Sequence, residues 1–226
     1  MKAIILIIAV FSVMLPVITQ KTGLSERHGF PLKMLCAFMY MLTGVLSAVY
    51  TGEKTEYSLM ILGGLLLGVL GDFFLEYKKK RYFSIGVVFF ALGHIVYSLT
   101  FLFAGAYKAV GHITAVISIT AVLTAAIIIF ARARMKLGGK KNILLLYAAV
   151  LIFTFAAAMV SGMVAAAEGN PFFALCLMTA SSLFVFSDML IGAKIGGMRR
   201  PKIFHYCVSY TYFAAQTLFA LSIIFQ

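Results

Sequence analysis

The sequence has few charged residues, and acidic residues are the scarcest of them. Charged residues make up 12% of the 226 positions and only 7 are Asp or Glu, whereas soluble domains carry roughly 25% charged residues. This scarcity excludes a soluble globular domain, and it also excludes a disordered chain, which needs low hydrophobicity and high charge density. No polar stretch is long enough to build a soluble catalytic domain. Because 63% of the residues are hydrophobic, we predict a polytopic membrane protein that forms one domain over residues 1–226.

Cysteine is also scarce. The three cysteines, Cys36, Cys176 and Cys207, all lie in apolar segments. An odd number of buried thiols argues against a disulfide framework, and no Cys/His cluster has the spacing of a zinc site.

Long apolar runs are abundant instead. A bilayer core about 30 Å thick requires roughly 20 apolar residues per helix. The runs are continuously apolar rather than alternating, so helices are expected instead of a barrel. The predicted fold is therefore an all-α bundle of eight transmembrane helices, at 3–18, 32–50, 57–75, 83–103, 110–130, 143–165, 172–193 and 204–225.

The net charge of +12 is explained by membrane topology, and we expect no nucleic-acid partner. With eight spans, 16 of the 19 Lys and Arg residues fall in the loops after the first, third, fifth and seventh spans. The positive-inside rule places these loops in the cytoplasm and both termini outside the cell. Residues 1–20 also have the pattern of a signal peptide. Cleavage there would move the basic loops outside, so we predict a retained first helix.

Two acidic residues lie inside predicted spans, where an ionisable group is costly and points to function. Asp72 lies four residues before Glu76, roughly 6 Å inside the cytoplasmic boundary at a rise of 1.5 Å per residue. Asp188 lies six residues before Lys194, so it is roughly 9 Å deep. The two spans run in the same direction, so the carboxyls have similar depth and meet if the spans are neighbours. The ends of these two spans have similar short sequences, which leaves open a duplication in which the second four spans repeat the first four.

Other polar residues in the spans suggest a pocket toward the cytoplasmic side. His94 is either a structural hydrogen-bonding residue or a contributor to this pocket, and Tyr97 shares its helix face. Gly64 and Gly68 stack on the face of Asp72, where they either allow close helix packing or leave a groove for an acyl chain. The remaining candidates are Tyr147, Ser187, Tyr212, Gln216 and, at the start of the second span, Lys33 as a phosphate ligand.

Four segments resemble the YhhN family, the lysoplasmalogenase family of multi-pass membrane proteins. They are LGDFFL at 70–75, Gly86 together with GHIVY at 93–97, SLFVFSD at 182–188, and YFAAQ at 212–216. The resemblance covers nearly the whole chain. One departure is that the family has Lys-Pro-Leu at the start of the second span, where this chain reads FPLK at 30–33.

The resemblance implies a hydrolase of the cell membrane whose substrate is lysoplasmalogen. It would cleave the vinyl ether bond to a fatty aldehyde and a glycerophospho-ethanolamine or -choline, at a site open toward the cytoplasm. Protonation of the β-carbon yields an oxocarbenium ion, and glycosidases use two carboxyl groups to form and stabilise a similar cation. Asp72 and Asp188 are the predicted pair, in an unassigned order, and His94 and Tyr97 would orient the substrate. No cofactor is required, although a metal held by Asp and His stays open.

Two other functions compete. One is a proton- or cation-coupled transporter of small solutes that uses the same two aspartates, and the other is a non-catalytic lipid-binding or assembly protein. Transport sites often lie near the midplane at broken helices. Here the acids lie toward one side and no predicted span has a proline in its middle, which favours the enzyme.

Overall fold

The structure is a computed structural model that describes residues 1–226 except 23, 53–54, 78–79, 106–107, 135–140 and 196–202. Several basic residues predicted for loops therefore lie outside the described residues, namely Lys54, Lys78, Lys79, Lys136, Lys140, Arg199, Arg200 and Lys202. No strand occurs in the described part of the chain.

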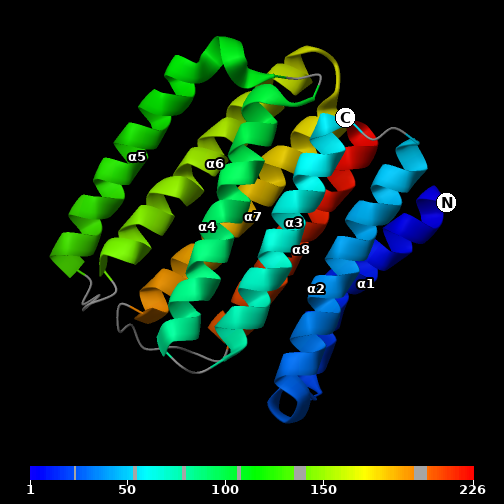
Figure 1. The fold of residues 1–226 in the computed structure, drawn as a ribbon, viewed down its shortest axis with the longest axis vertical. Helices are drawn as coiled ribbons and strands as arrows, with labels where there is room; N and C mark the ends of the chain where they lie inside the picture. Colours follow the sequence, from blue (N-terminus) through cyan, green and yellow to red (C-terminus); the bar gives the residue numbers. More distant parts are fainter. Residues whose placement is uncertain (23, 53–54, 78–79, 106–107, 135–140, 196–202) are drawn as a thin grey trace.

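Eight helices in the described residues are long and apolar enough to cross a membrane, which confirms the predicted fold class. Both termini lie at the same end of the bundle, in the upper part of Figure 1. The side of the membrane that they face stays a prediction. The elements are α1 (Lys2–Lys21), α2 (Leu24–Thr51), α3 (Glu56–Glu76), α4 (Lys80–Phe103), the short 3-10 helix η1 (Ala109–His112), α5 (Ile113–Arg134), α6 (Lys141–Ala167), α7 (Pro171–Ile195) and α8 (Ile203–Phe225).

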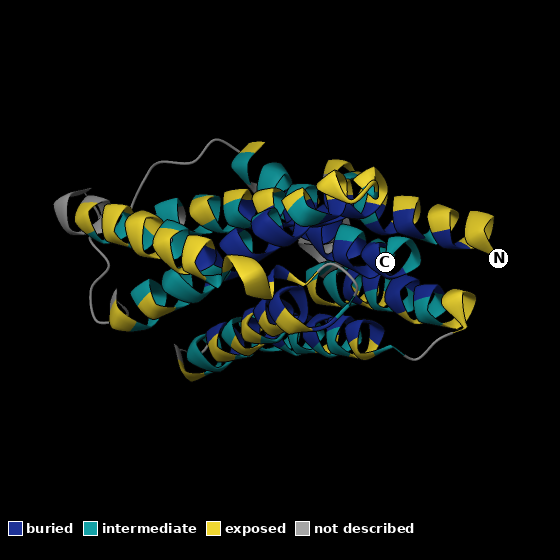
Figure 2. Ribbon diagram, turned by 90° about the horizontal axis from the view of Figure 1, so that it is seen from above, coloured by how far each residue is buried: buried dark blue, intermediate teal, exposed yellow. Residues whose placement is uncertain are grey.

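The α8 helix lies at the centre of the bundle and α5 at its edge. α8 packs against α1, α2, α3 and α7, and α4 packs against α3 and α6. In keeping with this, 61% of the residues in the most apolar stretch of α8 are buried, against 6% for α5. Figure 2 shows the buried residues on the inward faces of the helices. The polar residues of α8 therefore have neighbours on several sides.

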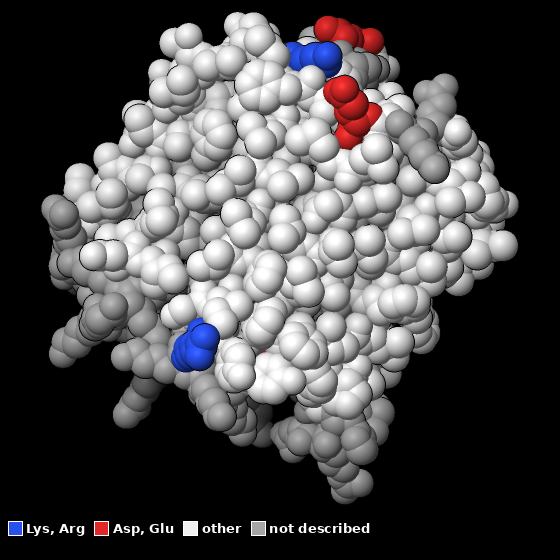
Figure 3. Space-filling view, in the orientation of Figure 1, with Lys and Arg blue, Asp and Glu red and all other residues white. Residues whose placement is uncertain are grey.

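The outer surface suits a bilayer. On the face drawn in Figure 3, the described Lys, Arg, Asp and Glu side chains lie near the two ends of the helices, with uncharged residues between them. Exposed apolar side chains cost nothing against lipid, so the burial of polar groups rather than apolar ones decides how the helices associate.

Side-chain caps set the start of two helices at the end of the bundle opposite the predicted site. Thr55 precedes α3, and its Oγ1 accepts the backbone N–H of Ser58 at 3.1 Å. Asn170 precedes α7, and its Oδ1 accepts the backbone N–H of Phe173 at 3.2 Å. The amide nitrogen of Asn170 also donates to the backbone oxygen of Phe225 at 2.6 Å. These contacts satisfy helix N-termini and join the start of α7 to the end of α8.

The α2 helix begins earlier than predicted. The sequence suggested a loop up to residue 31, whereas the helix starts at Leu24 and runs through Pro31. Its 28 residues span about 42 Å at 1.5 Å per residue, which exceeds the bilayer core of about 30 Å. The lower ends of α1 and α2 project beyond their neighbours in Figure 1. Lys33 therefore lies well inside this helix rather than at its first turn, so its side chain has a defined direction.

Candidate active site

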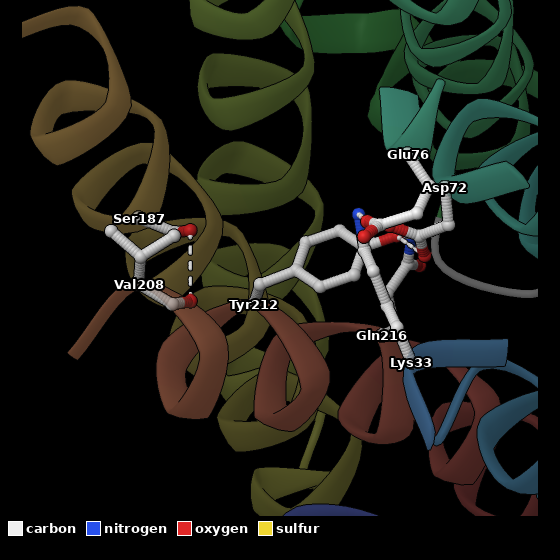
Figure 4. A network of polar contacts seen from close by, with 7 residues as sticks. All are labelled: Lys33, Asp72, Glu76, Ser187, Val208, Tyr212 and Gln216. Carbon is white, nitrogen blue, oxygen red and sulfur yellow. Dashed lines mark hydrogen bonds and ion pairs between the residues drawn. The ribbon is translucent and has the colours of Figure 1, made fainter. Parts of the chain in front are cut away.

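Asp72 lies one turn before the end of α3 and is almost fully buried, with 2% of its surface exposed. Its Oδ1 lies 3.2 Å from Nζ of Lys33 on α2, and its Oδ2 accepts a hydrogen bond of 2.7 Å from the hydroxyl of Tyr212 on α8. Figure 4 shows these groups converging from three helices. Lys33 also lies 3.8 Å from Oε2 of Glu76. Both oxygens of the Asp72 carboxyl group therefore have a donor.

A line of hydrogen bonds runs from α4 through α8 to Asp72. The Tyr97 hydroxyl donates to Oε1 of Gln216 at 2.8 Å, and Nε2 of Gln216 donates to the Tyr212 hydroxyl at 3.3 Å. Tyr212 and Gln216 are four residues apart and so share one face of α8. Every donor in this line points toward Asp72, so the line stabilises negative charge on its carboxyl group.

Asp188 lies on α7 and is partly buried. Its Oδ2 accepts a hydrogen bond from the hydroxyl of Tyr147 on α6. The preceding residue, Ser187, is buried and donates to the backbone oxygen of Val208 on α8 at 3.2 Å, as Figure 4 shows. Ser187 thus fastens α7 to α8 beside the carboxyl.

The two aspartates are not joined by a hydrogen bond in the described residues. The α8 helix packs against both α3 and α7, and a series of ring contacts runs from Tyr212, which is bonded to Asp72, to Tyr147, which is bonded to Asp188. The Phe184 ring lies 5.4 Å from that of Tyr212 and 4.5 Å from that of His94, whose ring lies 5.9 Å from that of Tyr147. Asp72 and Asp188 are nevertheless within electrostatic range of each other.

His94 has an unusual environment for a buried imidazole. Its residue is 2% exposed, yet neither ring nitrogen has a hydrogen-bond partner among the described residues. Its backbone oxygen accepts hydrogen bonds from the hydroxyls of Ser98 and Thr154 at 2.8 and 2.9 Å. The described residues therefore provide no hydrogen bond in support of a structural role for its side chain, and that interpretation stays a prediction. Buried polar groups without partners are rare and costly, so the ring is available to a ligand.

Gly64 and Gly68, on the Asp72 face of α3, allow polar side chains from neighbouring helices to pack against the α3 backbone. A Cβ at Gly64 would lie 2.2 Å from Cε1 of Tyr97, and one at Gly68 would lie 2.6 Å from Nε2 of Gln216. This supports close packing rather than an open acyl groove. The remaining hollow is too narrow for a water molecule, so a substrate chain can enter only if its lining moves. It is lined by Gly64, Gly68, Phe90, Gly93, His94, Tyr97, Phe184 and Gln216.

Tyr40 was missed by sequence reasoning. It is fully buried on α2, its ring lies 6.5 Å from that of Tyr212, and its hydroxyl is near Asp72. That hydroxyl has no hydrogen bond of ordinary geometry within the described part of the chain. A signal was present, because Lys33 and Tyr40 are seven residues apart and so lie on one helix face.

The site reaches the surface through two side chains at the end of the bundle that bears the basic loops. The side chain of Lys33 is 30% exposed and that of Glu76 is 37% exposed. Within the ranges that the structure describes, no three His, Cys, Asp or Glu side chains cluster as they would around a metal.

Comparison with known proteins gives a family but no individual relative. No curated protein and no solved structure matches the chain. The YhhN family matches residues 29–223, a range that includes every candidate residue described above. Together with the eight apolar helices, this match shows that the chain is a multi-pass membrane protein belonging to the YhhN family.

Proposed function

We propose that this protein is a hydrolase that cleaves the vinyl ether bond of lysoplasmalogens. Membership of the YhhN family is consistent with this activity. The observation that carries the proposal is the pair of carboxyl groups inside the membrane-spanning helices, each hydrogen-bonded to a tyrosine. Near them lies a buried imidazole whose two nitrogens have no partner among the described residues.

The reaction needs the groups that this site offers. A carboxylic acid transfers a proton to the β-carbon of the vinyl ether, and the double bond becomes an oxocarbenium ion. A nearby carboxylate stabilises that cation, as in glycoside hydrolysis. Water then adds to the cationic carbon and returns a proton to a carboxylate. The resulting hemiacetal splits into a fatty aldehyde and the glycerol hydroxyl of the headgroup product.

The location of the site suits a lipid substrate. Asp72 is buried among apolar helices, but its partner Lys33 reaches the surface beside Glu76. A single-chain lipid can therefore keep its polar headgroup at that boundary while its vinyl ether lies one or two turns deeper. The headgroup end of the predicted pocket would face the cytoplasm.

Purified protein in lipid nanodiscs, given a lysoplasmalogen, tests the proposal directly. We expect release of a fatty aldehyde, and we expect Asp72→Asn and Asp188→Asn each to abolish it while leaving folding largely intact. Glu168→Gln is the matched control, because it removes an exposed carboxyl at the opposite end of the bundle. Two active, well-folded Asn variants would rule out the two-carboxyl chemistry.

Heavy water tests the proposed first step. If protonation of carbon begins the reaction, aldehyde trapped at once by reduction carries one deuterium at its α-carbon, and the rate falls. A saturated ether analogue has no carbon to protonate, so it should bind without turnover. Aldehyde without α-deuterium would contradict the mechanism. Ion flux into liposomes without any aldehyde would instead favour the transporter.

A further inference from the structure

The two carboxyl groups have different surroundings, and this difference separates their roles. Asp72 faces an ammonium group on one oxygen and a hydroxyl donor on the other. Among the described residues, the charged and titratable groups near it are Lys33, Cys36 and Tyr40 on α2, Glu76 on α3, Asp188 on α7 and Tyr212 on α8. A cation at ion-pair distance together with a line of donors stabilises the ionised form of a carboxyl group.

Among the residues that the structure describes, the side-chain partner of Asp188 is the Tyr147 hydroxyl, which donates to Oδ2. Among the described residues, no Lys, Arg or His nitrogen lies within 4.0 Å of its carboxyl group, and the charge within range is that of Asp72. An unpaired carboxylate inside a membrane protein is costly, and a neighbouring carboxylate raises that cost further. The neutral acid is therefore the stable form, with its proton on Oδ1, because Oδ2 accepts the hydrogen bond from Tyr147.

We infer that Asp188 is the general acid of the proposed reaction and that Asp72, held ionised by Lys33, is the carboxylate that stabilises the oxocarbenium ion. The O–H bond of Asp188 breaks as the new C–H bond forms at the β-carbon, and the electron pair of the double bond makes that C–H bond. Water then forms a C–O bond to the cationic carbon and returns its proton to Asp188, which regenerates the acid. Asp72 and Lys33 keep their charges throughout.

This assignment also gives Lys33 a role different from phosphate binding. Its ammonium is a counter-ion for a buried carboxylate, 3.2 Å from Oδ1, so it is a positioning residue that sets the charge of Asp72. The catalytic part of the inference rests on the proposed function, whereas the protonation states do not. The test therefore begins with a measurement that needs no turnover.

Infrared spectroscopy of the protein in nanodiscs near neutral pH reports protonated carboxylic acids through a carbonyl stretch that shifts in heavy water. We expect wild-type protein to show one such band. Asp188→Asn should remove it, whereas Asp72→Asn and the control Glu76→Gln should leave it. Tyr147→Phe should shift the band without removing it, because the acid keeps its proton but loses its hydrogen bond.

Removal of the counter-ion Lys33 should add a protonated-acid band rather than remove one. Lys33→Met removes the ammonium, so Asp72 should take up a proton and a second band should appear, which Asp72→Asn then abolishes. A band that disappears with Asp72→Asn rather than Asp188→Asn would reverse the roles and overturn the inference. Absence of any protonated-acid band would overturn it as well. Failure of the lysoplasmalogen assay, with the bands as expected, would reject the proposed function and leave the charge assignment standing.

Discussion

A methyl group at Gly64 tests the packing around the hydrogen-bond line. In Gly64→Ala the new Cβ would lie 2.2 Å from Cε1 of Tyr97, about 1.3 Å short of the usual carbon–carbon contact near 3.5 Å. The tyrosine ring cannot easily withdraw, since it is 1% exposed and packs 4.7 Å from the ring of Phe219. The variant must therefore displace the ring and disrupt its hydrogen bond to Gln216.

The neighbouring glycine provides a matched control. A Cβ at Gly63 has only Cγ1 of Val96 nearby, at 4.0 Å. Both substitutions gain the same helix propensity, about 1 kcal/mol for Gly to Ala, so the difference between them isolates the contact with Tyr97. Overpacking costs about 1–3 kcal/mol and the lost hydrogen bond about 1 kcal/mol. We expect Gly64→Ala to be less stable than Gly63→Ala by about 2–4 kcal/mol.

Reversible unfolding of the two variants in mixed detergent micelles measures this difference as a free energy of unfolding. The double variant Gly64→Ala/Tyr97→Leu should recover part of the loss, because the smaller side chain vacates the contact. Equal stability of Gly64→Ala and Gly63→Ala would refute the close approach of Tyr97 to α3, and with it the line of donors that ends at Asp72.

Other predictions concern single groups. His94→Gln should lower aldehyde release by about 10²-fold if the imidazole assists proton transfer, and steady-state rates will show whether it does. Tyr212→Phe removes a donor to Asp72, so its unfolding free energy should fall by about 1 kcal/mol or more, measured as above. Asn170→Ala loses a helix cap and should cost about 1 kcal/mol with unchanged activity per folded molecule. In a variant free of native cysteines, Lys136→Cys should be labelled only from the cytoplasmic side, and labelling from outside would overturn the predicted orientation.

Much of the fold could be read from the sequence. Spans such as 83–103 are continuously apolar over a membrane thickness, and the helix α4 ends at the predicted residue, Phe103. The choice of Asp72 and Asp188 as candidates also followed from the sequence, because an acid inside an apolar run is conspicuous. The early start of α2 was not predicted: the predicted span begins at residue 32, whereas the helix begins at Leu24 and continues through Pro31.

The residues that surround each carboxyl were only partly predictable. Tyr212 and Gln216 were recognised from their spacing on one helix, and the structure connects both to Asp72. Tyr40 was missed because a lone tyrosine in an apolar helix does not reveal which neighbour it faces. The contact between Lys33 and Asp72 was missed because the two residues belong to different helices, and the sequence does not show which helices are neighbours.

The sequence by itself determined the number of spans. It also predicts the depth of the two acids and the side of the membrane on which the basic loops lie. Each of these depends on local hydrophobicity along one helix. The tertiary structure alone decided that α8 lies between α3 and α7, that Lys33 is the counter-ion of Asp72, and that the imidazole of His94 has no partner among the described residues. The physical reason is that helices in a bilayer are apolar toward both lipid and protein, so hydrophobicity does not mark which face turns inward or which helix it meets.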